Sequence, residues 1–224
     1  MLAGLFGIST AHATTIVMDD ANFNRLFNTD QGGSGDSIST HTLVVGTKAN
    51  GAGQDHHAGI AFQMTVASAA DLLVADFANF SISRTGGQGT PIYNVDVYAN
   101  RVSSASTFMN SDFENGTKLM DDFLTPSDGI GNYSLDATGQ ANLLSYLQNN
   151  WVEDDYVFIT LKANTDPTFI MGEDANANYN FGGAVGAWSA GALDAQLVIT
   201  VPEPSSTALL GLGGLAFMLR RKRS

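Results

Sequence analysis

The segment Ala195-Gln196-Leu197-Val198-Ile199-Thr200-Val201 places an apolar side chain at every second position. Successive side chains of a β-strand point to opposite faces, so this period of two is typical of a strand with one buried face. The same alternation is found in three earlier segments, at residues 60–66, 93–97 and 157–161. Further strands are predicted from the apolar segments 43–45, 72–77 and 80–82, with Gly- and Asn-rich turns at 31–35, 49–51 and 85–87.

Many short strands separated by turns predict an all-β domain, a two-sheet antiparallel β-sandwich of the jelly-roll type. One segment has a helical period instead. Ala141, Leu144 and Leu147 fall on one helical face after Thr138, which is a suitable N-cap, so we expect one short helix that ends before Trp151.

The chain changes character directly after Val201. Pro202-Glu203-Pro204 contains two prolines that prevent a strand or helix from continuing. An apolar run follows at 207–219, and the last basic residues are Arg220, Arg221, Lys222 and Arg223. Cations beside an apolar run hold that end of a membrane segment on the cytoplasmic side. The alternative is an ordinary membrane anchor, but thirteen apolar residues containing Gly211, Gly213 and Gly214 fall short of the roughly 20 that a spanning helix needs.

The order and terminal position of these three parts resemble the PEP-CTERM sorting signal of Gram-negative bacteria. The resemblance implies an exported protein with a transient membrane-anchored precursor, which an exosortase processes near Pro202-Glu203-Pro204. It also implies a location at the cell surface or in the extracellular matrix of a bacterium that makes exopolysaccharide or a biofilm. We therefore call residues 202–224 the sorting tail.

The N-terminus fits export as well. An apolar stretch covers residues 2–8, and Ala11-His12-Ala13 has the small-x-small form of a signal-peptidase site. We expect signal peptidase to cut after Ala13, so that residues 1–13 are a signal peptide and residues 14–201 are a single domain, which we call the body. The usual basic region before the apolar stretch is missing, so either the natural start lies upstream or the N-terminus has been trimmed.

The order of the predicted elements between residues 93 and 201 resembles DNRLRE-type and carbohydrate-binding-module-like jelly-roll sandwiches of bacterial surface proteins. No motif of fixed spacing accompanies this order, so the resemblance implies a fold and transfers no binding site. Trp188 lies in a glycine-rich loop and is the aromatic residue that we expect to stack on a sugar ring, whereas Trp151 is expected in the core.

Charge and oxygen-rich side chains bear on possible ligands. The chain has 22 acidic and ten basic residues and a formal net charge of −12, which makes nucleic acid an improbable partner. Residues 174–178 alternate oxygen ligands as an EF-hand does, but Tyr179 and Val185 replace its Gly and Glu. We expect either an exposed polar turn or a looser calcium loop formed by Glu173, Asp174, Asn176 and Asn178.

Catalytic patterns are weak. The chain has no cysteine and no Gly-x-Ser-x-Gly motif, and His56 and His57 are expected in a solvated loop rather than in a zinc site. We therefore predict a non-enzymatic exported body, a binding or structural module associated with exopolysaccharide. The alternative is a secreted hydrolase or lyase that acts on polysaccharide.

Overall fold

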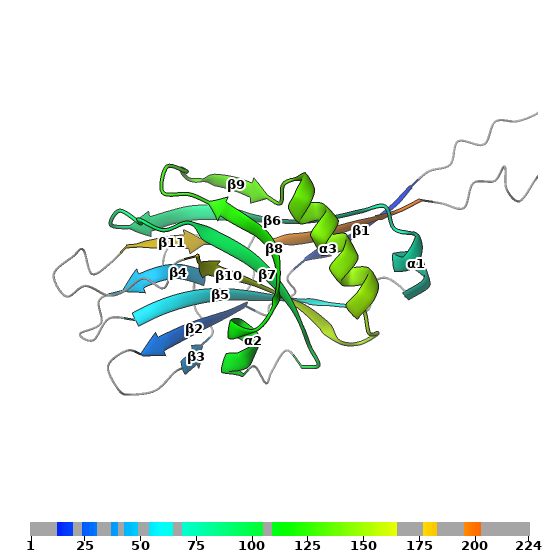
Figure 1. The fold of residues 1–224 in the computed structure, drawn as a ribbon, viewed down its shortest axis with the longest axis horizontal. Coiled ribbons are helices and arrows are strands. Elements are labelled where there is room, and N and C mark those ends of the chain that lie inside the picture. The colour runs from blue at the N-terminus through cyan, green and yellow to red at the C-terminus, as the bar shows by residue number, and fades with distance from the viewer. Residues whose placement is uncertain are drawn as a thin grey trace, which may run out of the picture.

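The computed structural model of the chain describes residues 13–19, 24–30, 37–39, 43–48, 54–64, 69–104, 109–164, 177–182 and 195–202. Over these residues the chain forms twelve strands and three helices (Figure 1). The strands are β1 (Thr14–Asp19), β2 (Asn24–Asp30), β3 (Ser37–Ser39), β4 (Leu43–Lys48), β5 (Gln54–Gln63), β6 (Phe77–Gln88), β7 (Val95–Val102), β8 (Thr117–Leu124), β9 (Gly131–Ser134), β10 (Tyr156–Ala163), β11 (Asn178–Phe181) and β12 (Gln196–Val201). The helices are α1 (Ala69–Val74), α2 (Asn110–Glu114) and α3 (Ala137–Asn150).

The described strands pair antiparallel in the order β1-β12-β6-β11-β4-β5-β10-β7-β8. β5 is the corner of this curled sheet. Its first residues pair with β4, and from Ala58 onward the same edge pairs with β10. A strand shared in this way carries the chain from one packed layer into the other. The prediction of an all-β antiparallel fold is confirmed, although the two layers are halves of one hydrogen-bonded sheet and the described residues form three helices where one was expected.

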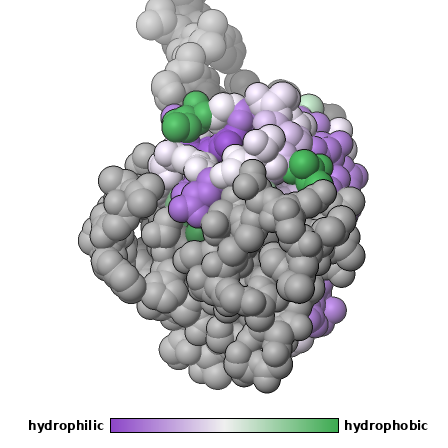
Figure 2. All heavy atoms as spheres, turned by 90° about the vertical axis from the view of Figure 1, so that its left-hand side faces the viewer, coloured by the Kyte–Doolittle hydropathy of each residue, from purple (hydrophilic) through white to green (hydrophobic). Residues whose placement is uncertain are grey.

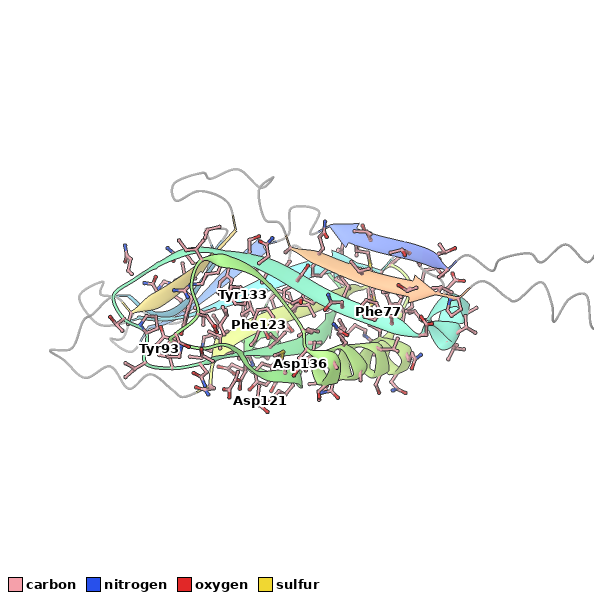
Figure 3. The ribbon with its side chains drawn as sticks, turned by 90° about the horizontal axis from the view of Figure 1, so that it is seen from above. Phe77, Tyr93, Asp121, Phe123, Tyr133 and Asp136 are labelled. Carbon is pink, nitrogen blue, oxygen red and sulfur yellow. The ribbon has the colours of Figure 1, made fainter. Side chains whose placement is uncertain are left out.

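The main core lies between the two layers, where aromatic rings connect the strands. The Phe80 ring of β6 lies 6.1 Å from that of Phe62 and 6.2 Å from that of Phe123, measured between centroids. Phe123 in turn lies 6.3 Å from Tyr133, which joins β8 to β9 (Figure 3). Burying a side chain of this size stabilises the folded state by about 1.5–3 kcal/mol.

A smaller apolar cluster covers the outer face of β10. Phe113 of α2 packs edge-on against Phe158, with ring centroids 4.9 Å apart. Gly59 of β5 lies beneath them, and a side chain there would collide with the Phe158 ring. β10 is therefore buried on both faces, which explains why Phe158 interrupts the alternation of the sequence with a further large apolar residue.

Helix α3 lies beside β6 and β8 and begins two residues earlier than the sequence indicated. The N-cap is Asp136 rather than Thr138, because the Asp136 carboxylate accepts a hydrogen bond from the Gly139 N–H at 2.7 Å. The buried face also differs from the expected one, since Ala141 is exposed and Leu144 only half-buried. The residues that α3 buries are Gly139, Leu143, Tyr146 and Leu147. The predicted end of the helix before Trp151 is correct.

Two other predictions are wrong. Residues 72–77 were expected as a strand, but residues up to Val74 belong to α1 and β6 starts at Phe77. Residues 85–87 were expected as a turn, but they continue β6 alongside β11. Gly87 is needed there because a side chain would meet the Asn178 carbonyl. The predicted turns at 31–35 and 49–51 lie outside the described residues.

Candidate functional site

The two ends of the body are paired strands. β1 and β12 run antiparallel, with Thr14 opposite Val201 and Asp19 opposite Gln196. Ala13, the last residue of the predicted signal peptide, therefore adjoins β1 at the same end of the molecule where Pro202 follows β12 (Figure 1). The tertiary structure thus brings Ala13 and Pro202 to the same end of the molecule, although they lie near opposite ends of the sequence.

Packing explains why these segments pair. Ile16 and Met18 of β1 lie opposite Ile199 and Leu197 of β12, and this row faces the core. β12 lies between β1 and β6, and its Leu197 and Ile199 are completely buried. The last strand before the sorting tail is consequently an integral part of the core.

The strand pairing ends at Pro202. The β12 backbone is paired up to Val201, and the Asp76 N–H also donates to the Thr200 carbonyl at 3.2 Å. Pro202 has no N–H to donate, so it cannot extend the pairing. A protease that binds extended backbone finds residues 196–201 already engaged in a sheet, and Pro202 is the first residue beyond this pairing.

A polar cluster connects β7, β8 and β10. The Lys118 ammonium lies 2.8 Å from Asp96 and 2.6 Å from Asp121, and these hydrogen bonds, that to Asp121 first, raise the pKa of Lys118. The Asp122 carboxylate accepts hydrogen bonds from Asn94 at 2.7 Å and Asn164 at 3.3 Å. Because these groups bind one another across three strands, the cluster stabilises this edge of the sheet.

Lys162 of β10 is a buried cation next to this cluster. Its ammonium donates to the Glu114 carbonyl at 2.8 Å and lies 4.3 Å from the centre of the Tyr98 ring. Burial lowers the pKa of Lys162 to about 8, against the opposing effect of Glu114. The hydrogen bond to Glu114 connects β10 to the end of α2, so this lysine also has a structural role.

The histidines are in a strand rather than in the solvated loop that the sequence predicted. His56 and His57 belong to β5, and the His56 side chain is buried. Burial, with smaller effects of the Lys162 and His56 charges, lowers the pKa of His57 to about 4. β5 is covered there because β2 and β4 pair with its two edges. The neighbouring Asp and His residues give no local signal of this pairing, because the partner strands come from other parts of the sequence.

Among the predicted ligand residues, Asn178 is described and is the first residue of β11, with its side chain buried. Glu173, Asp174, Asn176 and Trp188 lie outside the described residues, as do Ala11, Glu203, Pro204 and the basic end at 220–223. Within the described part of the chain, no group of three His, Cys, Asp or Glu residues could hold a metal ion. Trp151 is half-buried and packs against the main core as expected.

The sequence analysis did not predict β1. The signal was available in Thr14-Thr15-Ile16-Val17, a run of β-branched residues directly after Ala13. None of the described helices is both long and apolar enough to cross a membrane, and the apolar run at 207–219 is not among the described residues.

Comparison with known families identifies the C-terminal segment. A family model described as the PEP-CTERM protein-sorting motif matches residues 200–223. The match starts at the end of β12 and extends through the Pro-Glu-Pro motif, the apolar run and the basic end. No curated protein matches the chain. Through this C-terminal motif the match supports a PEP-CTERM protein, an exported protein that an exosortase processes at the cell envelope.

Proposed function

We propose that signal peptidase and an exosortase release the body as one intact β-sheet domain, and that this domain serves as a non-catalytic module outside the cell. The observation that carries the proposal is the pairing of Thr14 with Val201. The first residue after the predicted signal-peptidase cut and the last residue before the sorting tail lie directly opposite each other on adjacent strands. Both cuts can therefore remove their segments without taking a strand from the sheet.

The exosortase cut falls at or beyond Pro202 in this proposal. A cut within β12 would separate Leu197 or Ile199 from the body, and both side chains are fully buried between β1 and β6. Losing either would expose core surface worth several kcal/mol. The released product therefore comprises residues 14–201 together with any tail residues left by the cut.

The proposed role of the released body is binding or structural, in contact with exopolysaccharide at the surface or in the matrix of a Gram-negative bacterium. Support comes from the acidic composition and from the way Lys118, Asp96 and Asp121 bind one another, as structural rather than reactive groups do. We include in this proposal a calcium loop at 173–178, which would contribute to ligand binding. The alternative of a polysaccharide hydrolase or lyase requires a pair of carboxylates that face a bound sugar.

Mass spectrometry of the secreted product tests the processing step. The chain is expressed in a host with and without its exosortase, and the intact mass of the released body is measured. We expect an N-terminus at Thr14 and a C-terminus at or beyond Val201, only when the exosortase is present. Replacing Pro202, Glu203 and Pro204 by Ala should stop release, whereas replacing the next two residues, by Ser205→Ala with Ser206→Ala, should not. A C-terminus before Val201 would contradict the proposal.

Binding measurements test the proposed role of the body. The released body is screened against a panel of polysaccharides with calcium and again with chelator, while its melting temperature is followed. We expect glycan binding without release of product, and a chelator effect on both readouts if the 173–178 loop holds calcium. Release of oligosaccharide would favour the hydrolase or lyase alternative.

A further inference from the structure

Exposed apolar side chains gather where the chain leaves the body. Leu73 and Val74 of α1 are 72% and 58% exposed, and Phe77, the first residue of β6, is 36% exposed. Figure 3 shows Phe77 beside α1 at this end of the molecule. Leu73, Val74 and Phe77 thus form an exposed apolar surface where α1 leads into β6, and clustered apolar side chains on a surface are candidates for a contact site. We call these three residues the exit patch.

The exit patch is fixed to the strand that leads into the sorting tail. Phe77 pairs with Thr200, two residues before Pro202. On its other side α1 is held by Gln148 of α3, whose amide donates to the Leu72 and Ala75 carbonyls at 3.1 and 3.3 Å. Leu72 is buried against the core, so the helix cannot rotate Leu73 and Val74 inward without losing that contact.

The opposite end of the body differs. β6 rises about 3.3 Å per residue, so its last residue, Gln88, lies about 36 Å from Phe77. Figure 2 views the body from the Gln88 end, where the described surface is mostly polar and its apolar residues are separate. Ile92 is 80% exposed and lies four residues after the end of β6. Ile130 is 74% exposed and directly precedes Gly131, the β9 residue that pairs with Arg84. They are exposed apolar residues away from the exit.

The tail restricts what can cover the exit patch. Four residues separate Pro202 from the apolar run at 207–219. An extended chain advances at most about 3.6 Å per residue, so Pro202 lies within about 18 Å of Thr207. Whenever the run is inserted in a membrane, the end of the body that carries the exit patch is therefore held next to the lipid. This step rests on the proposed exosortase processing and on the membrane-anchored precursor that the sorting tail implies.

We propose that the exit patch is a membrane-contact surface, with the lipid bilayer that holds the sorting tail as its partner. Leu73, Val74 and Phe77 enter the interfacial layer of the bilayer and orient the body with its exit end toward the lipid. Asp71 and Asp76 flank the patch, so the surface suits zwitterionic lipid and is repelled by anionic lipid. The orientation presents the backbone after Pro202 at the membrane surface, where a membrane-embedded exosortase acts.

The contact depends on the tail. Two aliphatic side chains and one ring without neighbouring cations bind a bilayer weakly, and a short tether makes the contact effective by raising the local concentration. Cutting the tail removes the tether. The body then leaves the membrane without any change of fold, so the same cut that separates the tail also ends the lipid contact.

Site-directed fluorescence on the full chain tests the proposal. The chain contains no cysteine, so single substitutions accept one label each. Leu73→Cys and Val74→Cys report on the exit patch, Ile92→Cys and Ile130→Cys are matched exposed controls, and Leu209→Cys reports on the tail. Each labelled chain is reconstituted into phosphatidylcholine vesicles and quenched with lipid-attached nitroxide or with aqueous iodide. We expect the α1 labels to be quenched by nitroxide several-fold more strongly than the controls, and iodide to show the reverse order.

Different failures have different signatures. If the Leu209 label is quenched by nitroxide but the α1 labels match the controls, the membrane contact is overturned and tail insertion stands. If α1 labels are shielded from iodide without nitroxide quenching, a second copy covers the patch and the lipid proposal is overturned. If the Leu209 label is not quenched, the anchored precursor itself is refuted, and this inference with it.

A double variant separates the loss of lipid contact from an effect on folding. Leu73→Gln with Val74→Gln changes exposed side chains only, so the melting temperature should be unchanged. A label at Thr15→Cys, which shares the outer row of Thr200 and Phe77, should then lose its nitroxide quenching in the double variant. Unchanged quenching at Thr15 with an intact fold would overturn the role of α1.

Discussion

Removing buried atoms from β12 measures how firmly the last strand belongs to the body. Ile199 is completely buried, opposite Ile16 of β1 and Ala78 of β6. Ile199→Ala deletes three carbon atoms, a transfer loss of about 2.4 kcal/mol at roughly 0.8 kcal/mol per carbon. The cavity adds to this loss because paired strands on both sides limit its collapse. We expect the free energy of unfolding to fall by about 3–4 kcal/mol.

Equilibrium urea unfolding, followed by the fluorescence of half-buried Trp151, measures this change. Ile199→Val should cost only about 0.5–1.5 kcal/mol. Val198→Ala is the matched control on the same strand, because Val198 is half-buried and faces the opposite side, and it should cost less than about 1 kcal/mol. If Ile199→Ala costs no more than Val198→Ala, β12 is not inserted in the core. The argument for an exosortase cut beyond Val201 would then be refuted.

Two further predictions concern α3 and β5. Asp136→Ala removes the cap of the Gly139 N–H and should lower the free energy of unfolding by about 1 kcal/mol, whereas Asp136→Ser should restore most of it; equal losses in urea titrations would refute the cap. Folded His57 has a pKa of about 4, below the 6.5 of the unfolded chain, so unfolding takes up a proton between these values and stability falls as pH drops through that window. Between pH 7 and pH 5 the titration of His57 should lower the free energy of unfolding by up to about 2 kcal/mol. In thermal melts at both pH values, His57→Gln should lose less stability on going to pH 5 than the unchanged protein does.

Several elements could be predicted from the sequence because their signals are local. Residues 157–161 and 195–201 were correctly predicted as strands, since a strand with one buried face must alternate its apolar residues. The short helix before Trp151 was predicted for the same kind of reason, from a period near 3.6. Its true N-cap, Asp136, was missed because Thr138 is an equally good cap by residue type.

The errors have long-range causes. The apolar run at 72–77 suits a strand or a helix equally, and its helical part is held by hydrogen bonds from Gln148 on α3. Gly86 and Gly87 have the composition of a turn, yet they lie in β6 because β11 approaches too closely there for a side chain at Gly87. His56 and His57 are covered because β2 and β4 pair with the strand that carries them.

The sequence by itself determined the sorting address, because the prolines, the apolar run and the basic end of PEP-CTERM proteins act in linear order and need no folded partner. It also determined the all-β class through its period of two. Only the tertiary structure decided that Thr14 lies opposite Val201 and that Phe77, which follows α1 in the sequence, pairs with Thr200 just before the tail. Strand partners are chosen by burial of complementary faces between residues far apart in the chain, and no local pattern contains that information.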